Sequence, residues 1–247
     1  FRGDHLEAPH HVAGDADGSV CTLTWMPDGR LAYSIDDSGY WEVHVLGPSG
    51  SERVSWFDAD CGGPAWQLGT SSIAPLADGR LACVLTERAT HRLVLVDPDT
   101  SEVTDVSLPY AYLDRIQSYG DGVAFIAANA NGTRTVVAWT PGRPAIELAQ
   151  YRLPRLADDD CPVPEPIEVG TPDGDTTHAF LWRPVSANVD GPDDERPPLI
   201  VRTHGGPTGN VHPVLTTDIA YWTTRGFAVA DVNYRGSTGF GRAYRDA

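Results

Sequence analysis

The strongest constraint on the fold is an internal repeat in the first 150 residues, built on an Asp-Gly turn. The segment Met-Pro-Asp-Gly-Arg-Leu-Ala-Tyr at residues 26–33 recurs as Leu-Ala-Asp-Gly-Arg-Leu-Ala-Cys at residues 76–83, and in weaker form at residues 119–125. The three turns are spaced about 45 residues apart. Repetition at such a period indicates that one small structural unit occurs several times along the chain.

Each copy of the repeat predicts a pair of β-strands. The Asp-Gly turn leads into a short apolar segment, which is typical of a hairpin strand. A second apolar segment follows roughly ten residues later and ends at a turn rich in Pro, Gly or Asp. The predicted pairs cover residues 31–35 and 41–46, 81–85 and 92–96, and 123–127 and 135–139.

Antiparallel units of this length are typical of the blades of a β-propeller, which contain four strands each. We therefore expect a partial β-propeller over residues 1–155, with about three blades and part of another. A β-sandwich with coincidental turns is the alternative. Because a propeller ring usually has roughly four to eight blades, we expect further blades to precede Phe1 and the chain to be a fragment.

The chain changes character near residue 155. Residues 156–166 contain an Asp-Asp-Asp run and three prolines, which predicts a linker with a solvated acidic surface. Residues 167–247 then predict the start of a parallel α/β sheet, in which a strand, a crossover helix and a second strand follow one another. The predicted strands cover residues 167–169, 178–182, 199–201 and 227–232, the helix covers 218–224, and the last two strands are expected to be buried on both faces.

The sequence His204-Gly205-Gly206-Pro207 directly follows the predicted strand at 199–201. Two glycines at the carboxyl end of a strand let backbone N–H groups approach a ligand, and ligands bind at this edge of open α/β sheets. In α/β-hydrolases a loop of this type donates one N–H group to the oxyanion hole. Two glycines after a strand can also mark only a tight turn.

A second motif, Asn-Tyr-Arg-Gly-Ser-Thr-Gly-Phe-Gly-Arg at residues 233–242, follows the next predicted strand. Together the two motifs resemble the start of the catalytic domain of the prolyl oligopeptidase family of serine peptidases. The resemblance is closest to the branch of acylaminoacyl-peptidases and dipeptidyl aminopeptidases, and it covers about residues 165–247. It implies a partial β-propeller followed by the N-terminal part of an α/β-hydrolase domain, because this family carries a propeller ahead of its hydrolase domain.

The resemblance also implies an activity and a set of site residues. The activity is hydrolysis of short peptides by a Ser-Asp-His triad, with an oligopeptide as substrate. The backbone N–H of Gly206 is the expected oxyanion donor, since residues 208–212 contain no Tyr that could replace it. His204, Gly205 and Arg235 are candidate substrate-binding residues, although His204 can instead shape its loop and Arg235 can instead brace the loop beneath the site.

The nucleophile of this family lies in a Gly-x-Ser-x-Gly sequence, with Asp and His following in chain order. No such sequence occurs in the 247 residues. Ser237 is not assigned as the nucleophile, because Arg235 stands where the motif needs Gly. We therefore expect the triad downstream of Ala247, and we expect this chain alone to be inactive.

Charge and composition exclude several other functions. The 34 acidic against 18 basic residues give a net charge of −16, which argues against nucleic acid and anionic membranes as partners. No apolar segment approaches the roughly 20 residues of a membrane span. The four cysteines lack metal-ligand spacing, so buried thiols are expected, with no metal and no cofactor.

We expect a cytoplasmic protein. The sequence does not decide whether it forms a homo-oligomer. An esterase-like α/β-hydrolase and a non-catalytic propeller that serves as a binding module are the alternative functions. The repeat and Pro207 argue against the esterase, whose loop usually has a further Gly at that position.

Overall fold

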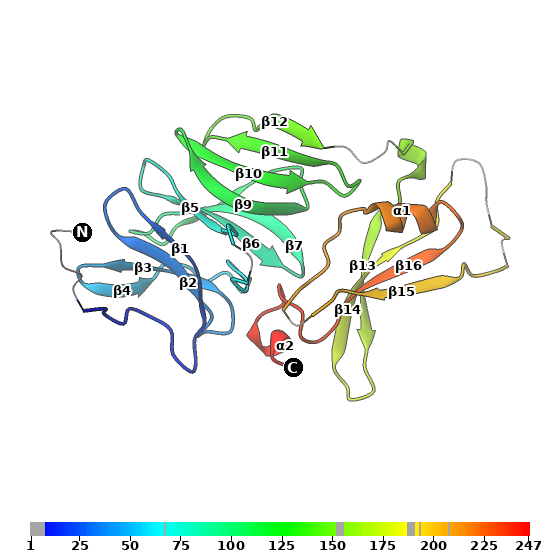
Figure 1. Cartoon of the computed structure of the whole chain (residues 1–247), viewed down its shortest axis with the longest axis horizontal. Coiled ribbons are helices and arrows are strands. Elements are labelled where there is room, and N and C mark those ends of the chain that lie inside the picture. The colour runs from blue at the N-terminus through cyan, green and yellow to red at the C-terminus, as the bar shows by residue number, and fades with distance from the viewer. Residues whose placement is uncertain (1–7, 67, 152–155, 187–190, 193, 207) are drawn as a thin grey trace.

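In the part of the chain that the structure describes, the strands form four sheets of four strands each. The computed structural model describes residues 8–66, 68–151, 156–186, 191–192, 194–206 and 208–247. Three sheets come from the part of the chain before residue 152, and the fourth comes from the part after residue 163. In Figure 1 the first three sheets follow one another in blue, cyan and green, and the fourth lies beside them in yellow to red.

The first three sheets are antiparallel, and their strands are in chain order. The first contains β1 (Val20–Trp25), β2 (Leu31–Ile35), β3 (Glu42–Gly47) and β4 (Gly50–Arg53). The second contains β5 (Ile73–Pro75), β6 (Leu81–Glu87), β7 (Thr90–Val96) and β8 (Val103–Val106). The third contains β9 (Tyr112–Tyr119), β10 (Gly122–Ala128), β11 (Arg134–Trp139) and β12 (Ile146–Tyr151). The prediction of repeated four-stranded antiparallel units is confirmed.

The repeated Asp-Gly turns connect the first and second strands of the first two sheets. Gly29 N donates to Met26 O at 3.0 Å, and Gly79 N donates to Leu76 O at 3.1 Å. Both glycines have φ near +90°, a conformation that L-residues with a side chain rarely adopt. The turn glycine thus explains why the Asp-Gly pair recurs at this point of each unit.

The second sheet packs on both of its faces, as the side chains of β6 illustrate. Leu81, Cys83 and Leu85 belong to the apolar cluster shared with the first sheet. Ala82 and Val84, which alternate with them, belong to the cluster shared with the third sheet. Since successive side chains of a strand point to opposite faces, β6 is apolar along its whole length, and the three sheets lie face to face.

The fourth sheet is mixed, with the strand order β13-β14-β16-β15. It contains β13 (Pro164–Gly170), β14 (Thr176–Trp182), β15 (Leu199–Thr203) and β16 (Ala228–Asn233). Helix α1 (Thr217–Thr223) connects β15 to β16, and these two strands pair in parallel. The predicted strand, crossover helix and strand are confirmed.

Three features of this second half differ from expectation. Leu199 and Val201, which share one face of β15, are 55% and 62% exposed, so the prediction that this strand is buried on both faces is wrong for these residues. Ile200, on the other face, packs against the apolar cluster of the fourth sheet. β13 begins at Pro164, inside the segment expected to be a linker. The acidic run of that segment forms a short 3-10 helix, η1 (Asp158–Asp160). A second helix, α2 (Arg242–Arg245), was not anticipated.

Cys21, Cys61 and Cys83 are buried, as the sequence analysis expected, whereas Cys161 is only partly buried. Among the described residues, no helix has the length and apolar character needed to cross a lipid bilayer.

Candidate active site

Two loops meet at one edge of the fourth sheet. The HGG loop (residues 204–206) follows β15, and the glycine-rich loop (residues 234–241) follows β16. Because β15 and β16 are parallel neighbours, their carboxyl ends lie at the same edge. The two motifs that carried the sequence prediction are therefore brought together.

The two loops are joined by Tyr234, His204 and Ser237. The Tyr234 hydroxyl donates to Gly206 O at 2.9 Å, and the Tyr234 ring stacks on the His204 ring with centroids 4.4 Å apart. The Ser237 hydroxyl donates to Tyr234 O at 2.6 Å. Its oxygen is therefore left to accept the Nε2–H of His204, at 2.7 Å,.

The contact between Ser237 and His204 resembles that of a nucleophile beside its base. The burial and the hydrogen bonds of Ser237 instead fit a structural role. The Ser237 side chain is buried without exposure to solvent, and its proton is directed to a backbone carbonyl. A nucleophile must be reached by its substrate, and its proton must be free to move to the base. The geometry agrees with the sequence argument that left Ser237 unassigned.

Gly205 and Gly206 are exposed at the tip of the HGG loop. Gly206 has φ of +70°, and apart from its two chain neighbours no described atom lies within 4 Å of the position a Cβ would take. The left-handed conformation explains why glycine occupies this position. The fourth residue of the motif, Pro207, lies outside the described residues.

The segment after the HGG loop is also bound to the glycine-rich loop. Thr238 N donates to Gly209 O at 3.0 Å, and Asn210 Nδ2 donates to Thr238 O at 3.2 Å. The Asn233 side chain accepts from Val211 N at 2.8 Å and donates to Val211 O at 3.0 Å. Backbone and side-chain bonds thus hold both loops in one arrangement.

Arg235 contacts the turn between β13 and β14. Its Nη1 forms ion pairs with Asp173 at 2.7 Å and with Asp175 at 3.3 Å. A hydrogen bond from Thr171 and then the Arg235 guanidinium lower the pKa of Asp173 to about 2. The structure therefore places the Arg235 side chain against this turn.

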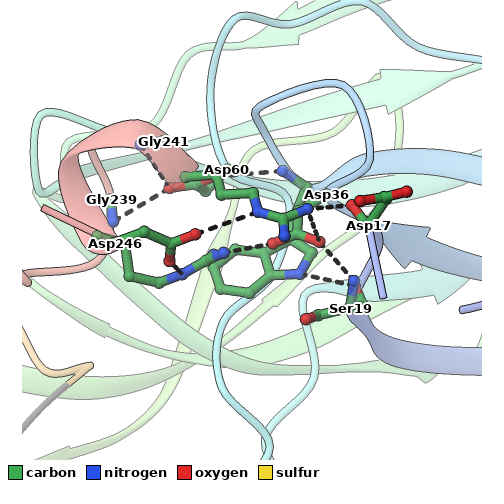
Figure 2. Close-up of polar contacts among 10 residues, drawn as sticks. Asp17, Ser19, Asp36, Asp60, Gly239, Gly241 and Asp246 are labelled. Atoms are coloured by element: carbon green, nitrogen blue, oxygen red, sulfur yellow. Dashed lines mark hydrogen bonds and ion pairs between the residues drawn. The ribbon is translucent and has the colours of Figure 1, made fainter. Parts of the chain in front are cut away.

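The first two sheets contact the glycine-rich loop through the buried carboxylate of Asp60, which sequence reasoning missed. Asp60 Oδ2 accepts from Gly239 N at 3.1 Å and from Gly241 N at 3.2 Å. Its Oδ1 accepts from Trp41 N at 3.2 Å. Burial raises the pKa of Asp60, and the three backbone donors oppose that shift. Figure 2 shows the carboxylate between these groups.

A second buried carboxylate, Asp36 in the turn after β2, binds helix α2. Arg245 donates to Asp36 Oδ2 at 2.5 Å, and its guanidinium lies 4.3 Å from the centre of the Trp41 ring. Ser19 N donates to Asp36 Oδ1 at 2.6 Å, and Arg242 donates to the carbonyl of Asp17. These contacts appear in Figure 2. No local sequence motif predicts the contacts of Arg242 and Arg245, since their partners are more than 200 residues away in the chain.

A cavity of about 150 Å³ lies between the two halves of the chain. Asn210, His212, Thr238 and Gly239 line it on one side, and residues of the second and third sheets line it on the other. His212 Nδ1 lies 2.9 Å from Ala89 O, and the rings of His91 and His212 pack edge to face with centroids 4.7 Å apart. Burial lowers the pKa of His91 to about 3 and that of His212 to about 4.

Among the described residues, no three His, Cys, Asp or Glu side chains are grouped so that they could hold a metal ion.

Comparisons with known proteins identify relatives with peptidase names. No protein-family model matches the chain. The chain is 30% identical over 203 residues to dipeptidyl aminopeptidase BIII of Pseudoxanthomonas mexicana, an alignment that covers 70% of this chain and 29% of that protein.

Two solved structures are similar in both fold and sequence. The crystal structure of a puromycin hydrolase matches with a TM-score of 0.86 and 35% identity over 93% of this chain and 35% of its own. A puromycin-hydrolyzing peptidase of Mycobacterium tuberculosis matches with a TM-score of 0.90 and 33% identity over 97% of this chain and 38% of its own. The chain thus spans less than two fifths of the length of these relatives.

Proposed function

Since this chain belongs to the prolyl oligopeptidase family of serine peptidases, we propose that it is a segment of an enzyme that hydrolyses short peptides. Residues 1–155 are then part of a β-propeller, and residues 164–247 begin an α/β-hydrolase domain. Residues 156–163 connect the two, since β13 begins at Pro164. The face-to-face packing of three four-stranded sheets and the parallel pair of β15 and β16 support this division.

The observation that carries the proposal is the contact between the two loops beside an exposed glycine. The Tyr234 hydroxyl binds Gly206 O, while Gly206 itself is exposed and has open space on its Cβ side. In the proposed mechanism the backbone N–H of Gly206 donates to the oxyanion of the tetrahedral intermediate. Such a donor stabilises charge that develops only as the reaction proceeds, and losing one costs roughly 10²–10³ in turnover number.

We assign His204 to the support of this loop, since its ring is already stacked on Tyr234 and bound to Ser237. Gly205 and Gly206 remain the groups of the motif that a substrate can approach. Arg235 serves as a brace through its ion pairs with the β13–β14 turn. The nucleophile is a serine outside residues 1–247, because the chain lacks the Gly-x-Ser-x-Gly sequence of the family,.

The relatives suggest the class of substrate. One is named a dipeptidyl aminopeptidase and two are named for the hydrolysis of puromycin. For this protein we propose oligopeptide substrates, with a peptide or related amide bond as the bond that is cleaved.

A fluorophosphonate probe applied to the full-length protein tests the proposal, because the probe forms a covalent bond with an activated serine. We expect one labelled serine, located by peptide mass spectrometry outside residues 1–247, and loss of hydrolysis of a peptidyl p-nitroanilide in step with labelling. Labelling of Ser237, or a folded full-length protein that neither labels nor hydrolyses the substrate, would contradict it.

A further inference from the structure

We infer that Asp60, a residue of the propeller segment, is a positioning residue for the HGG loop at the start of the hydrolase segment. The inference rests on the proposed function and extends it. The propeller segment would then help to build the oxyanion site, in addition to any effect on substrate access.

The Asp60 carboxylate is held rigidly before it contacts the glycine-rich loop. Asp60 and Thr86 exchange two backbone hydrogen bonds, at 3.0 and 2.8 Å. The segment that connects the first sheet to the second is therefore fixed to β6. The side chain is 1% exposed. With one oxygen bound to Trp41 N, the other is directed at the N–H groups of Gly239 and Gly241.

The glycine-rich loop fits this contact closely. A Cβ on Gly239 would lie 2.7 Å from the Thr86 Cγ2 atom, and a Cβ on Gly241 would lie 2.8 Å from a ring carbon of Tyr40. Both glycines also have positive φ. The loop therefore passes so close to the first two sheets that only glycine fits at these two positions.

Two short relays lead from Asp60 to the HGG loop. Gly239 follows Thr238, which binds Gly209 and Asn210 on the chain just after the HGG loop. Thr238 follows Ser237, which accepts the His204 Nε2–H. A shift of the glycine-rich loop would therefore move His204, at the start of the HGG loop, and Gly209, on the chain just after it.

The carboxylate suits this task better than its amide would. Asp60 accepts three N–H bonds with two oxygens, whereas an Asn at this position has one oxygen and one NH₂ group. In either orientation of the amide, its NH₂ group faces at least one backbone donor. Asp60→Asn therefore keeps the size of the side chain and removes at least one bond of the contact.

The experiment uses the full-length protein and compares Asp60→Asn with Asp58→Asn. Asp58 lies two residues before Asp60 and is exposed. The control therefore removes the same charge from the same segment between the first and second sheets. For each variant we would measure kcat and KM on a peptidyl p-nitroanilide. We would also measure Ki for a peptide boronate, which mimics the tetrahedral intermediate, and for the product peptide, which does not.

For Asp60→Asn we expect kcat to fall about 10- to 100-fold, since small misplacements of a catalytic group have effects of this size. The Ki of the boronate should rise in proportion, while KM and the Ki of the product peptide stay within about 2-fold. Asp58→Asn should match wild type in all four constants. Equal changes in the boronate and product constants, or no change in either, would overturn the inference.

Ser237→Ala tests the same relay from its other end, and it serves alone if Asp60→Asn fails to fold. It removes the acceptor of the His204 Nε2–H but leaves the contact with the first two sheets. We expect the same split between kcat and KM, and in the double variant a loss smaller than the product of the two single losses. An unchanged kcat for Ser237→Ala, or fully independent effects, would overturn the inference.

Failure of the proposed function is recognised separately, because wild type would then neither hydrolyse the substrate nor bind the boronate. Hydrogen exchange still decides the positioning role in that case. Amides of residues 204–211 should exchange faster in Asp60→Asn than in Asp58→Asn, and equal rates would overturn it.

Discussion

At the scale of single residues, the Tyr234 hydroxyl holds the candidate site together without a catalytic role of its own. Tyr234 donates to Gly206 O at 2.9 Å and lies 3.2 Å from His204 O, while its ring stacks on the His204 ring. The side chain thus fixes two carbonyl groups of the HGG loop and one face of its histidine. A loop fixed in this way can present an N–H group without reorganising during the reaction.

Tyr234→Phe removes these hydrogen bonds and keeps the ring. We expect kcat of the full-length protein to fall about 10-fold with little change in KM, because the contact positions Gly206, whose N–H group is proposed to act in the transition state. Steady-state kinetics on a peptidyl p-nitroanilide measure the effect. A matched Tyr119→Phe variant, which changes an exposed tyrosine of β9, should leave both constants unaltered. An unchanged kcat for Tyr234→Phe would show that the hydroxyl has no positioning role.

The histidines between the two halves make stability depend on pH. His91 and His212 have pKa values lowered to about 3 and about 4, while an unfolded histidine titrates near 6.5. Between about pH 6.5 and pH 4 the unfolded chain therefore binds protons that the folded chain does not, so the free energy of unfolding falls as the pH falls.

We expect the melting temperature to be lower at pH 5 than at pH 7, and we expect His212→Gln to reduce that difference by removing one of the titrating groups. Thermal unfolding followed by circular dichroism at both pH values measures this. If His212→Gln and wild type show the same difference, the lowered pKa of His212 makes no contribution to stability.

At the scale of elements, the repeat was predictable because its signals are local. The Asp-Gly turn forms within four residues, and the alternation of side chains along β6 follows from the geometry of a strand. β15 shows where this reasoning ends. Its apolar run predicts burial on both faces, yet Leu199 and Val201 are exposed, because burial of a sheet face depends on which other segments pack on it and not on the strand's own residues.

The contacts that hold the candidate site could not be predicted either, because they too depend on segments that are far apart in the chain. Gly206 and Tyr234 belong to motifs, and their loops follow predicted neighbouring strands. Asp60 lies nearly 180 residues before the glycines that it binds, and nothing in its own sequence distinguishes it from an exposed aspartate such as Asp58. Its role becomes visible only when the fold brings the two segments together.

Helix α2 provides a test at this scale, because it is too short to be stable alone and is anchored by Arg245. Arg245→Met removes the nearer partner of a buried ion pair and leaves the Asp36 carboxylate with only the more distant guanidinium of Arg242, at 3.9 Å. We expect a loss of about 3 to 5 kcal/mol in the free energy of unfolding, measured by urea denaturation. Arg143→Met, which changes an exposed arginine, should cost far less. Equal losses for the two variants would contradict the anchoring role.

At the scale of the whole molecule, the two halves are interlocked at the place where the candidate site forms. Asp36 and Asp60 from the first half bind α2 and the glycine-rich loop of the second half. Ala89, in the turn between β6 and β7, packs in the apolar cluster of the fourth sheet. Under the proposed function, the oxyanion site belongs to one segment and the other segment supports it.

The most direct test of this account is an experimental structure of the full-length protein with a peptide boronate bound to its nucleophile. The account predicts that one boronate oxygen lies about 3 Å from the backbone nitrogen of Gly206, with the glycine-rich loop still bound to Asp60 and the boron bonded to a serine outside residues 1–247. A boronate oxygen out of hydrogen-bond reach of Gly206, or boron bonded to Ser237, would contradict it.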